Sequence, residues 1–204
     1  LNQDENIYSF RIKTPDEKVE KIVSLNLEVP KSTILLGFPG EYEYNLENRI
    51  LLSAINDILK TRYVETIREE EGGTYGASVR TSQSKYPENK FLVRISFDCA
   101  PENSENLLGI VLEEIEKLRT EGPTEKEVHD VVAHKIKNRA EGLKENSFWL
   151  SILEHNDYMN EGAENITEYE EIVNNLDPEK IKQAAHDLID PEKYVKVVLK
   201  PKEE

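Results

Sequence analysis

The stretch KFLVRISFD, residues 90–98, decides the fold, because apolar and polar side chains alternate along its whole length. Successive side chains of a strand point to opposite faces of a sheet. One predicted face carries Phe91, Val93, Ile95 and Phe97. The other carries Leu92, Arg94, Ser96 and Asp98. A strand with one apolar face and one wetter face is typical of an antiparallel sheet that covers a core on one side.

Further strands are predicted on both sides of this stretch. Residues 74–84 are expected to pair with it as a hairpin across KYPEN. Residues 7–38 are interpreted as strands, namely IYSFRI, KIVSLNLEV and STILLGF, with breaks at Pro30 and at Pro39-Gly40. YVKVVLK, residues 194–200, closes the chain as a further strand.

The remaining segments have the apolar spacing of helices. The first runs from about 46 to 71 and ends at Gly72-Gly73, and the next spans about 105–122. A third begins at a capping box of Thr124 and Glu127 and ends near residue 144. NSFWLSILEHNDYM follows, with Trp149, Ile152 and Leu153 on one side. Thr167 with Glu170, and then Asp177-Pro178, are expected to start the last two helices.

Strands, a helix, a hairpin, several helices and a last strand predict an α+β fold. We expect a largely antiparallel sheet with helices packed on one face. Residues 31–204 are assigned to one domain, and residues 1–30 to an N-terminal arm or strands that lead into it. No secretory signal begins at Leu1, which is not a natural start, so the chain is expected to be part of a longer protein.

Composition excludes several classes of function. The 204 residues carry a formal net charge of −15, which disfavours binding to nucleic acid. No apolar run approaches the ~18 residues that a membrane-spanning helix needs. Cys99 is the single cysteine, so no internal disulfide forms, and a buried, inert thiol is expected. Frequent Lys, Glu and Asn suggest a prokaryotic source, with a bacterial periplasm or cytoplasm as the expected compartment.

The common catalytic patterns are missing. The four histidines are His129, His134, His155 and His186. No H-E-x-x-H or H-x-x-E-H occurs, and the five-residue spacing of His129 and His134 places them on different sides of a helix. We therefore predict that this chain binds no metal. No G-x-S-x-G nucleophile or phosphate loop is present, and the acidic runs are expected to be solvated helix faces.

The corner EEEGGTYGASV, residues 69–79, is the remaining candidate site. Arg68 would end a helix and Tyr75 would start a strand, so both would be held on rigid elements. A guanidinium can bind a peptide carbonyl or carboxylate, and a phenol can donate to an oxygen that gains negative charge. The alternative is structural: Arg68 makes surface ion pairs, the glycines stop the helix, and the Tyr75 ring packs at the sheet edge.

ETIREEEGGTYGASV resembles the corner in the C-terminal half of M16 (pitrilysin or insulinase-type) zinc metallopeptidases. The supporting pieces follow in the same order: NRILLSAINDILKTRYVETIREE, FLVRISFDCAPENSENL, LRTEGPTEKEV, ENSFWL and YVKVVLKP. The resemblance covers roughly residues 30–201 and implies an α/β roll of the LuxS/metallopeptidase-like kind. The zinc motif of the family and its distal glutamate are absent, so this resembles the non-zinc domain.

The resemblance implies the following roles. Zinc would be the cofactor of the complete enzyme, held by an N-terminal half or by a partner subunit, and peptides would be the substrates. Tyr75 would donate to the scissile carbonyl oxygen, Arg68 would hold substrate backbone, and Gly73, with Gly72 and Gly76, would shape the corner. This fragment alone is expected to be inactive. Two alternatives stay open: a non-catalytic M16-like subunit, and an acidic domain with an unrelated α+β fold.

Overall fold

The structure is a computed structural model that describes residues 14–26, 28, 30–70 and 77–202, with backbone only for residues 68–70. Its strands are β1 (Val19–Leu25), β2 (Ser32–Glu41), β3 (Ser78–Ser84), β4 (Lys90–Cys99) and β5 (Val195–Pro201). Its helices are α1 (Leu46–Glu70), η1 (Pro101–Asn103), α2 (Ser104–Thr120), α3 (Glu125–Gly142), α4 (Asn146–Met159), α5 (Glu164–Asn174) and α6 (Pro178–Leu188). Among the described helices, none is long and apolar enough to cross a bilayer.

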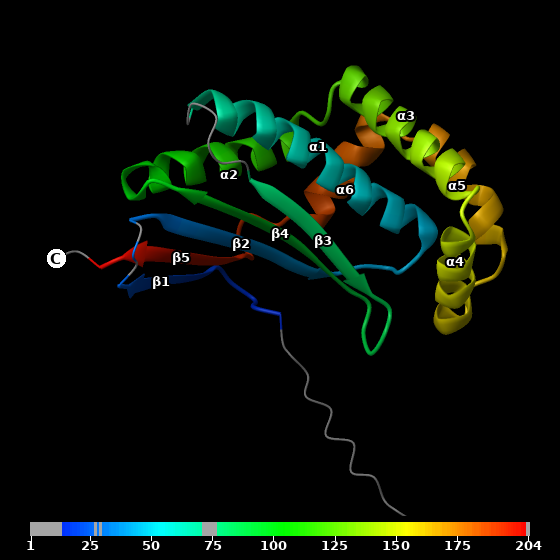
Figure 1. Cartoon of the computed structure of the whole chain (residues 1–204), viewed down its shortest axis with the longest axis horizontal. Helices are drawn as coiled ribbons and strands as arrows, with labels where there is room; N and C mark the ends of the chain where they lie inside the picture. The colour runs from blue at the N-terminus through cyan, green and yellow to red at the C-terminus, as the bar shows by residue number, and fades with distance from the viewer. Residues whose placement is uncertain (1–13, 27, 29, 71–76, 203–204) are drawn as a thin grey trace, which may run out of the picture.

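The five strands form one sheet in the order β1-β5-β2-β4-β3. β1 pairs with β5 in parallel, and the other three pairings are antiparallel. Figure 1 shows α1, α2 and α6 lying over one face of this sheet, whereas α3, α4 and α5 extend beyond one end. The predicted α+β fold, a largely antiparallel sheet with helices on one face, is therefore confirmed.

The alternation that predicted β4 places its apolar side chains in the core. Phe91, Val93, Ile95 and Phe97 are at most 5% exposed. Leu36 of β2 and Val79 of β3 both lie opposite Ile95, so buried residues of three strands meet on the helix-covered face. Cys99, at the end of β4, is buried as expected.

The predicted break at Pro39-Gly40 is wrong, because β2 continues to Glu41 and pairs with β4 along its whole length. Proline has no N–H to donate to a neighbouring strand, so it is found where that side of its own strand is unpaired. The pairing of β5 with β2 spans Thr33 to Gly37, so Pro39 lies past the end of that neighbour. A proline is tolerated there because only the β4 side of the strand is paired.

Two of the three predicted helix caps are confirmed. Thr124 and Glu127 form the reciprocal capping box of α3, and Asp177 accepts a hydrogen bond from the Lys180 N–H at the start of α6. The predicted box of Thr167 and Glu170 is wrong: α5 begins at Glu164, and the Thr167 hydroxyl donates to the Glu164 carbonyl instead. A Ser/Thr-x-x-Glu pattern also occurs inside helices, where the hydroxyl bonds back to the preceding turn.

The N-terminal strands are described in part. β1 forms an edge of the same sheet, whereas IYSFRI lies outside the described residues. The division of the chain at residue 30 stays a prediction.

Candidate functional site

The corner predicted from the sequence joins α1 to β3. Arg68 lies in the last turn of α1, where the structure describes its backbone, and Gly73 and Tyr75 lie outside the described residues, as do Gly72 and Gly76. Both arms of the corner are anchored in the core, since Ile67 is 0% exposed and Val79 is 6% exposed. The connection between them is therefore held at each end by buried side chains.

The described residues offer no place for zinc. No group of three or more His, Cys, Asp or Glu side chains in residues 14–26, 28, 30–70 and 77–202 could hold a metal ion. His129, His134 and His186 are exposed on α3 and α6, and His155 contacts an arginine instead of a cluster of acids. The His, Cys, Asp and Glu side chains of the described residues therefore do not form a zinc site of the kind found in M16 metallopeptidases.

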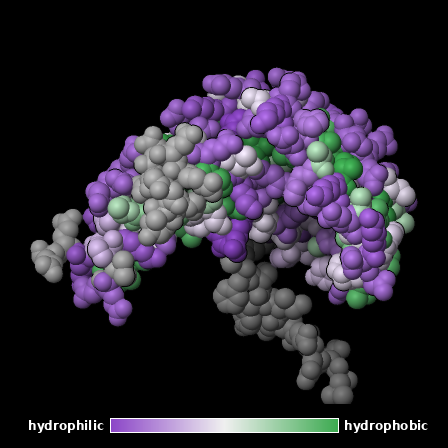
Figure 2. Space-filling view, turned by 45° about the horizontal axis from the view of Figure 1, so that its top comes forward, coloured by the Kyte–Doolittle hydropathy of each residue, from purple (hydrophilic) through white to green (hydrophobic). Residues whose placement is uncertain are grey.

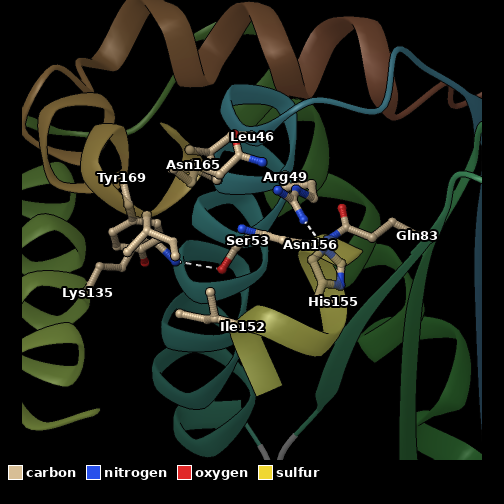
Figure 3. Close-up of a pocket in the computed structure, with 12 residues that line it drawn as sticks. Leu46, Arg49, Ser53, Gln83, Lys135, Ile152, His155, Asn156, Asn165 and Tyr169 are labelled. Carbon is tan, nitrogen blue, oxygen red and sulfur yellow. Dashed lines mark hydrogen bonds between the residues drawn. The ribbon is translucent and has the colours of Figure 1, made fainter. Parts of the chain in front are cut away.

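A pocket of about 250 Å³ lies where α1, α3, α4 and α5 meet, and we call it the α1–α4 pocket (Figure 3). Figure 3 shows Lys135 reaching from α3 toward Ser53 of α1, and Arg49 of α1 pointing toward His155 of α4. The pocket is lined by Leu46, Arg49, Ile50, Ser53, Gln83, Lys135, Ile152, His155, Asn156, Asn165, Ile166 and Tyr169.

Arg49 is the centre of the first polar cluster in this pocket. Its Nη2 lies 3.0 Å from Glu161 Oε2, and the side chains of both residues are nearly buried. Its Nη1 contacts His155 Nε2 and lies 3.4 Å from the Tyr44 hydroxyl. A guanidinium only donates, so His155 Nε2 must accept, and the ring is neutral with its proton on Nδ1. Burial and the adjacent Arg49 charge lower the pKa of His155, in agreement with that neutral form.

Lys135 forms the second cluster. Its ammonium is 2.6 Å from Ser53 Oγ and 2.8 Å from Asp57 Oδ2, and the residue is 7% exposed. Each cation of the pocket thus has a carboxylate from this chain beside it. A buried charge needs such a partner, so the pairs fix α3, α4 and the loop after α4 onto α1.

Sequence reasoning missed the α1–α4 pocket. Arg49 and His155 are 106 residues apart, and nothing in the sequence connects them. Lys135 did leave a signal, because Val128, Val131, Lys135 and Arg139 recur at helical spacing on the buried side of α3. The pocket is also far from the predicted corner: Arg49 and Arg68 lie 19 residues apart on α1, or roughly 28 Å at 1.5 Å per residue.

Residues 3–134 match the family described as the peptidase M16 inactive domain. This chain belongs to that family. The match covers the corner and confirms the resemblance seen in the sequence.

Other relatives agree with this M16 assignment. A protein of Arabidopsis thaliana named "zinc protease PQQL-like" is 28% identical over 143 residues, which is 67% of this chain and 15% of that protein. The periplasmic protease PqqL of Escherichia coli matches the fold with a TM-score of 0.78 and 20% identity, over 91% of this chain and 21% of that chain. A peptidase M16 inactive domain from Pseudomonas fluorescens gives 0.78 and 21% over 94% of this chain and 46% of that one. The chain thus spans less than half the length of each of these relatives.

Proposed function

We propose that this chain is the C-terminal, substrate-binding domain of an M16-type zinc metalloendopeptidase that hydrolyses peptides in a closed chamber. The observation that carries the proposal is the family match over residues 3–134, which includes the corner from Arg68 to Tyr75. The buried residues Ile67 and Val79 on either side of the corner support it, because they fix the ends of α1 and β3 from which a site would be built.

The proposed roles follow from side-chain chemistry. Tyr75 donates a hydrogen bond to the scissile carbonyl oxygen as that oxygen becomes negative, which lowers the energy of the transition state. The fork of donors on Arg68 binds a substrate backbone carbonyl or carboxylate. Gly73, without a side chain, lets the substrate approach the corner closely.

Zinc is proposed to belong to another part of the enzyme, either an N-terminal half or a partner subunit. The described residues of this chain offer no ligand set for the metal. We therefore expect the isolated chain to bind no zinc and to cleave no peptide.

The test compares Tyr75→Phe with wild type in an active assembly that contains the zinc-bearing half, using a fluorogenic peptide. Loss of one donor to a developing oxyanion is expected to lower kcat by about 10²–10³-fold with little change in KM. Tyr86→Phe is the matched control, since Tyr86 is 51% exposed on the β3–β4 turn, and its activity should be unchanged. Full activity of Tyr75→Phe would show that the assigned role is wrong.

A second candidate is a non-catalytic M16-like subunit with a structural or partner-binding role. The family description as an inactive domain favours it. An H-x-x-E-H motif in an adjoining or partner chain, together with peptide cleavage by the assembly, would decide for the enzyme. Absence of the motif from both the adjoining and the partner chain would favour the non-catalytic subunit.

A further inference from the structure

The outward side of α4 is apolar and uncovered. Trp149, Leu150 and Leu153 are 39%, 68% and 57% exposed, and we call these three residues the α4 face. They follow one another at i, i+1 and i+4, so they occupy about 100° of the helix surface. In Figure 2, apolar surface gathers on the side where α4 lies in Figure 1, within a mostly polar exterior.

This exposure is not spread evenly over the molecule. The described residues include eight exposed large hydrophobic side chains, and five of them lie on α4 or against it. Besides the three residues of the α4 face, these are Tyr158 and Tyr86. Their rings are arranged edge to face, with 6.4 Å between the ring centroids. A cluster of this kind marks an interaction surface more often than scattered single residues do.

A neighbouring side of α4 contacts other parts of the chain. The Phe148 ring contacts the Arg139 guanidinium, Ile152 lines the α1–α4 pocket, and the Asn156 amide donates to the Gly162 carbonyl at 3.1 Å. Trp149, Ile152 and Leu153 share one side of the helix as predicted from their spacing, but they differ in burial, because Ile152 lines the pocket whereas Trp149 and Leu153 are exposed. α4 turns Ile152 toward the pocket and leaves Trp149, Leu150 and Leu153 exposed to water.

Acidic side chains border the α4 face. Glu154 and Asp157 are exposed and follow Leu150 and Leu153 by four residues, so each lies one turn further along the same line of the helix. Residues 145–179 contain ten acidic residues and no lysine or arginine. The Lys85 ammonium donates to the Met159 carbonyl at the C-terminal end of α4, so the negative charge is local to the Glu154 and Asp157 side of the apolar surface, where it attracts cations.

This charge selects among possible occupants. A second copy of the chain would bring a like-charged surface, and nucleic acid or an anionic membrane would be repelled in the same way. We propose that the α4 face binds a lysine- or arginine-rich amphipathic helix of a partner protein. The leucines of such a helix would cover Leu150 and Leu153, and its cations would pair with Glu154 and Asp157. This surface is independent of the function proposed for the corner.

Trp149 is the only tryptophan of the chain, so its fluorescence reports on this surface directly. The probe is a synthetic 18-residue helical peptide with leucines on one side and lysines on the other. Binding is expected to shift the Trp149 emission to the blue and to weaken as salt is raised. Two comparison peptides carry glutamate in place of lysine, or serine in place of leucine, and neither should bind.

Variants of the chain distinguish specific binding at the α4 face from nonspecific attraction of the basic peptide to an acidic protein. Leu150→Ser with Leu153→Ser should weaken binding, measured by calorimetry, by roughly tenfold or more because the apolar contact is lost. Glu154→Lys with Asp157→Lys should do the same. The matched control, Glu168→Lys with Glu171→Lys, makes an equal change of net charge on exposed positions of α5 and should leave binding within about twofold.

Three results would overturn the proposal. One is equal loss of binding in the α4 and α5 charge variants, which would mean that only net charge matters. Another is tight binding by the glutamate or the serine peptide. The third is self-association of the wild-type chain that the Leu150→Ser, Leu153→Ser variant abolishes, since it would make a second copy the occupant. Far-ultraviolet circular dichroism of each variant verifies that its fold is retained.

Discussion

Replacement of Arg62 by methionine tests whether the ion cluster beneath α1 stabilises the fold. The Arg62 fork donates to both oxygens of Glu127, at 2.6 and 3.0 Å, and to the Gly122 carbonyl at 3.2 Å. Glu114 of α2 lies 3.6 Å away. Glu127 also caps α3 through the Thr124 N–H at 2.7 Å. One side chain therefore connects three helices at a single point.

The expected cost is about 3 kcal/mol of unfolding free energy. Removal of one partner from a buried pair costs about 3–5 kcal/mol, because the remaining charge is left without compensation. The side chains of Arg62, Glu114 and Glu127 are 13%, 12% and 23% exposed, so water reaches the remaining carboxylates in part. Methionine keeps most of the packing of the aliphatic stem, so the loss reports mainly on the charge.

Urea unfolding followed by far-ultraviolet circular dichroism measures this loss. With a urea dependence of about 2 kcal/mol per molar, the midpoint should fall by about 1.5 M. Glu127→Gln and the double variant complete a cycle, and the double variant should be less unstable than the sum of the two single changes.

The same cluster has a defined pH dependence. Burial alone would raise the pKa of the Glu127 carboxyl, but hydrogen bonds from Arg62 and Thr124 hold it below the usual 4.5. A lowered folded-state pKa contributes stability above pH 4.5 that is lost as pH falls through the folded value. The gap between wild type and Arg62→Met should therefore narrow in acid. The reasoning would be refuted if Arg62→Met lowered the unfolding free energy by less than about 0.5 kcal/mol at pH 7, because that is the contribution of a solvent-exposed ion pair. It would also be refuted if the difference in unfolding free energy between wild type and Arg62→Met did not change with pH.

Three further variants probe other parts of the fold. Tyr63→Phe removes the buried hydroxyl that donates to the Val111 carbonyl at 3.1 Å and should cost about 1 kcal/mol in urea unfolding; no change would mean that this bond is worth nothing. His155→Gln should flatten the loss of stability between pH 7 and 5, because burial and Arg49 lower the pKa of His155 and stability falls as pH drops below 6.5. A wild-type thermal midpoint insensitive to pH in that range would contradict it. Gly122→Ala should lower the thermal midpoint by an amount equivalent to about 1 kcal/mol or more, since φ is 83° there, and Gly109→Ala, with open space around it, is the control.

The sequence alone determined most of the local structure. Strict alternation over residues 90–98 fixed a half-buried strand, and the Thr124 and Asp177 caps located two helix starts. Such signals are local, since they depend on side chains within one or two turns of each other. The family was also visible in the sequence, because its pieces keep their order along the chain. The roles of Arg68, Gly73 and Tyr75 stay predictions.

Only the tertiary structure decided which faces are covered and which charges meet. The pairs Arg49–Glu161 and Arg62–Glu127 join residues 112 and 65 apart, and a sequence contains many acids that could serve either arginine. The apolar residues of α4 have helical spacing, yet which of them are covered depends on the neighbours that the fold brings to that helix, such as Arg139 of α3 beside Phe148. Spacing defines a helix and its possible faces, but burial depends on neighbours that the chain brings together only when it folds.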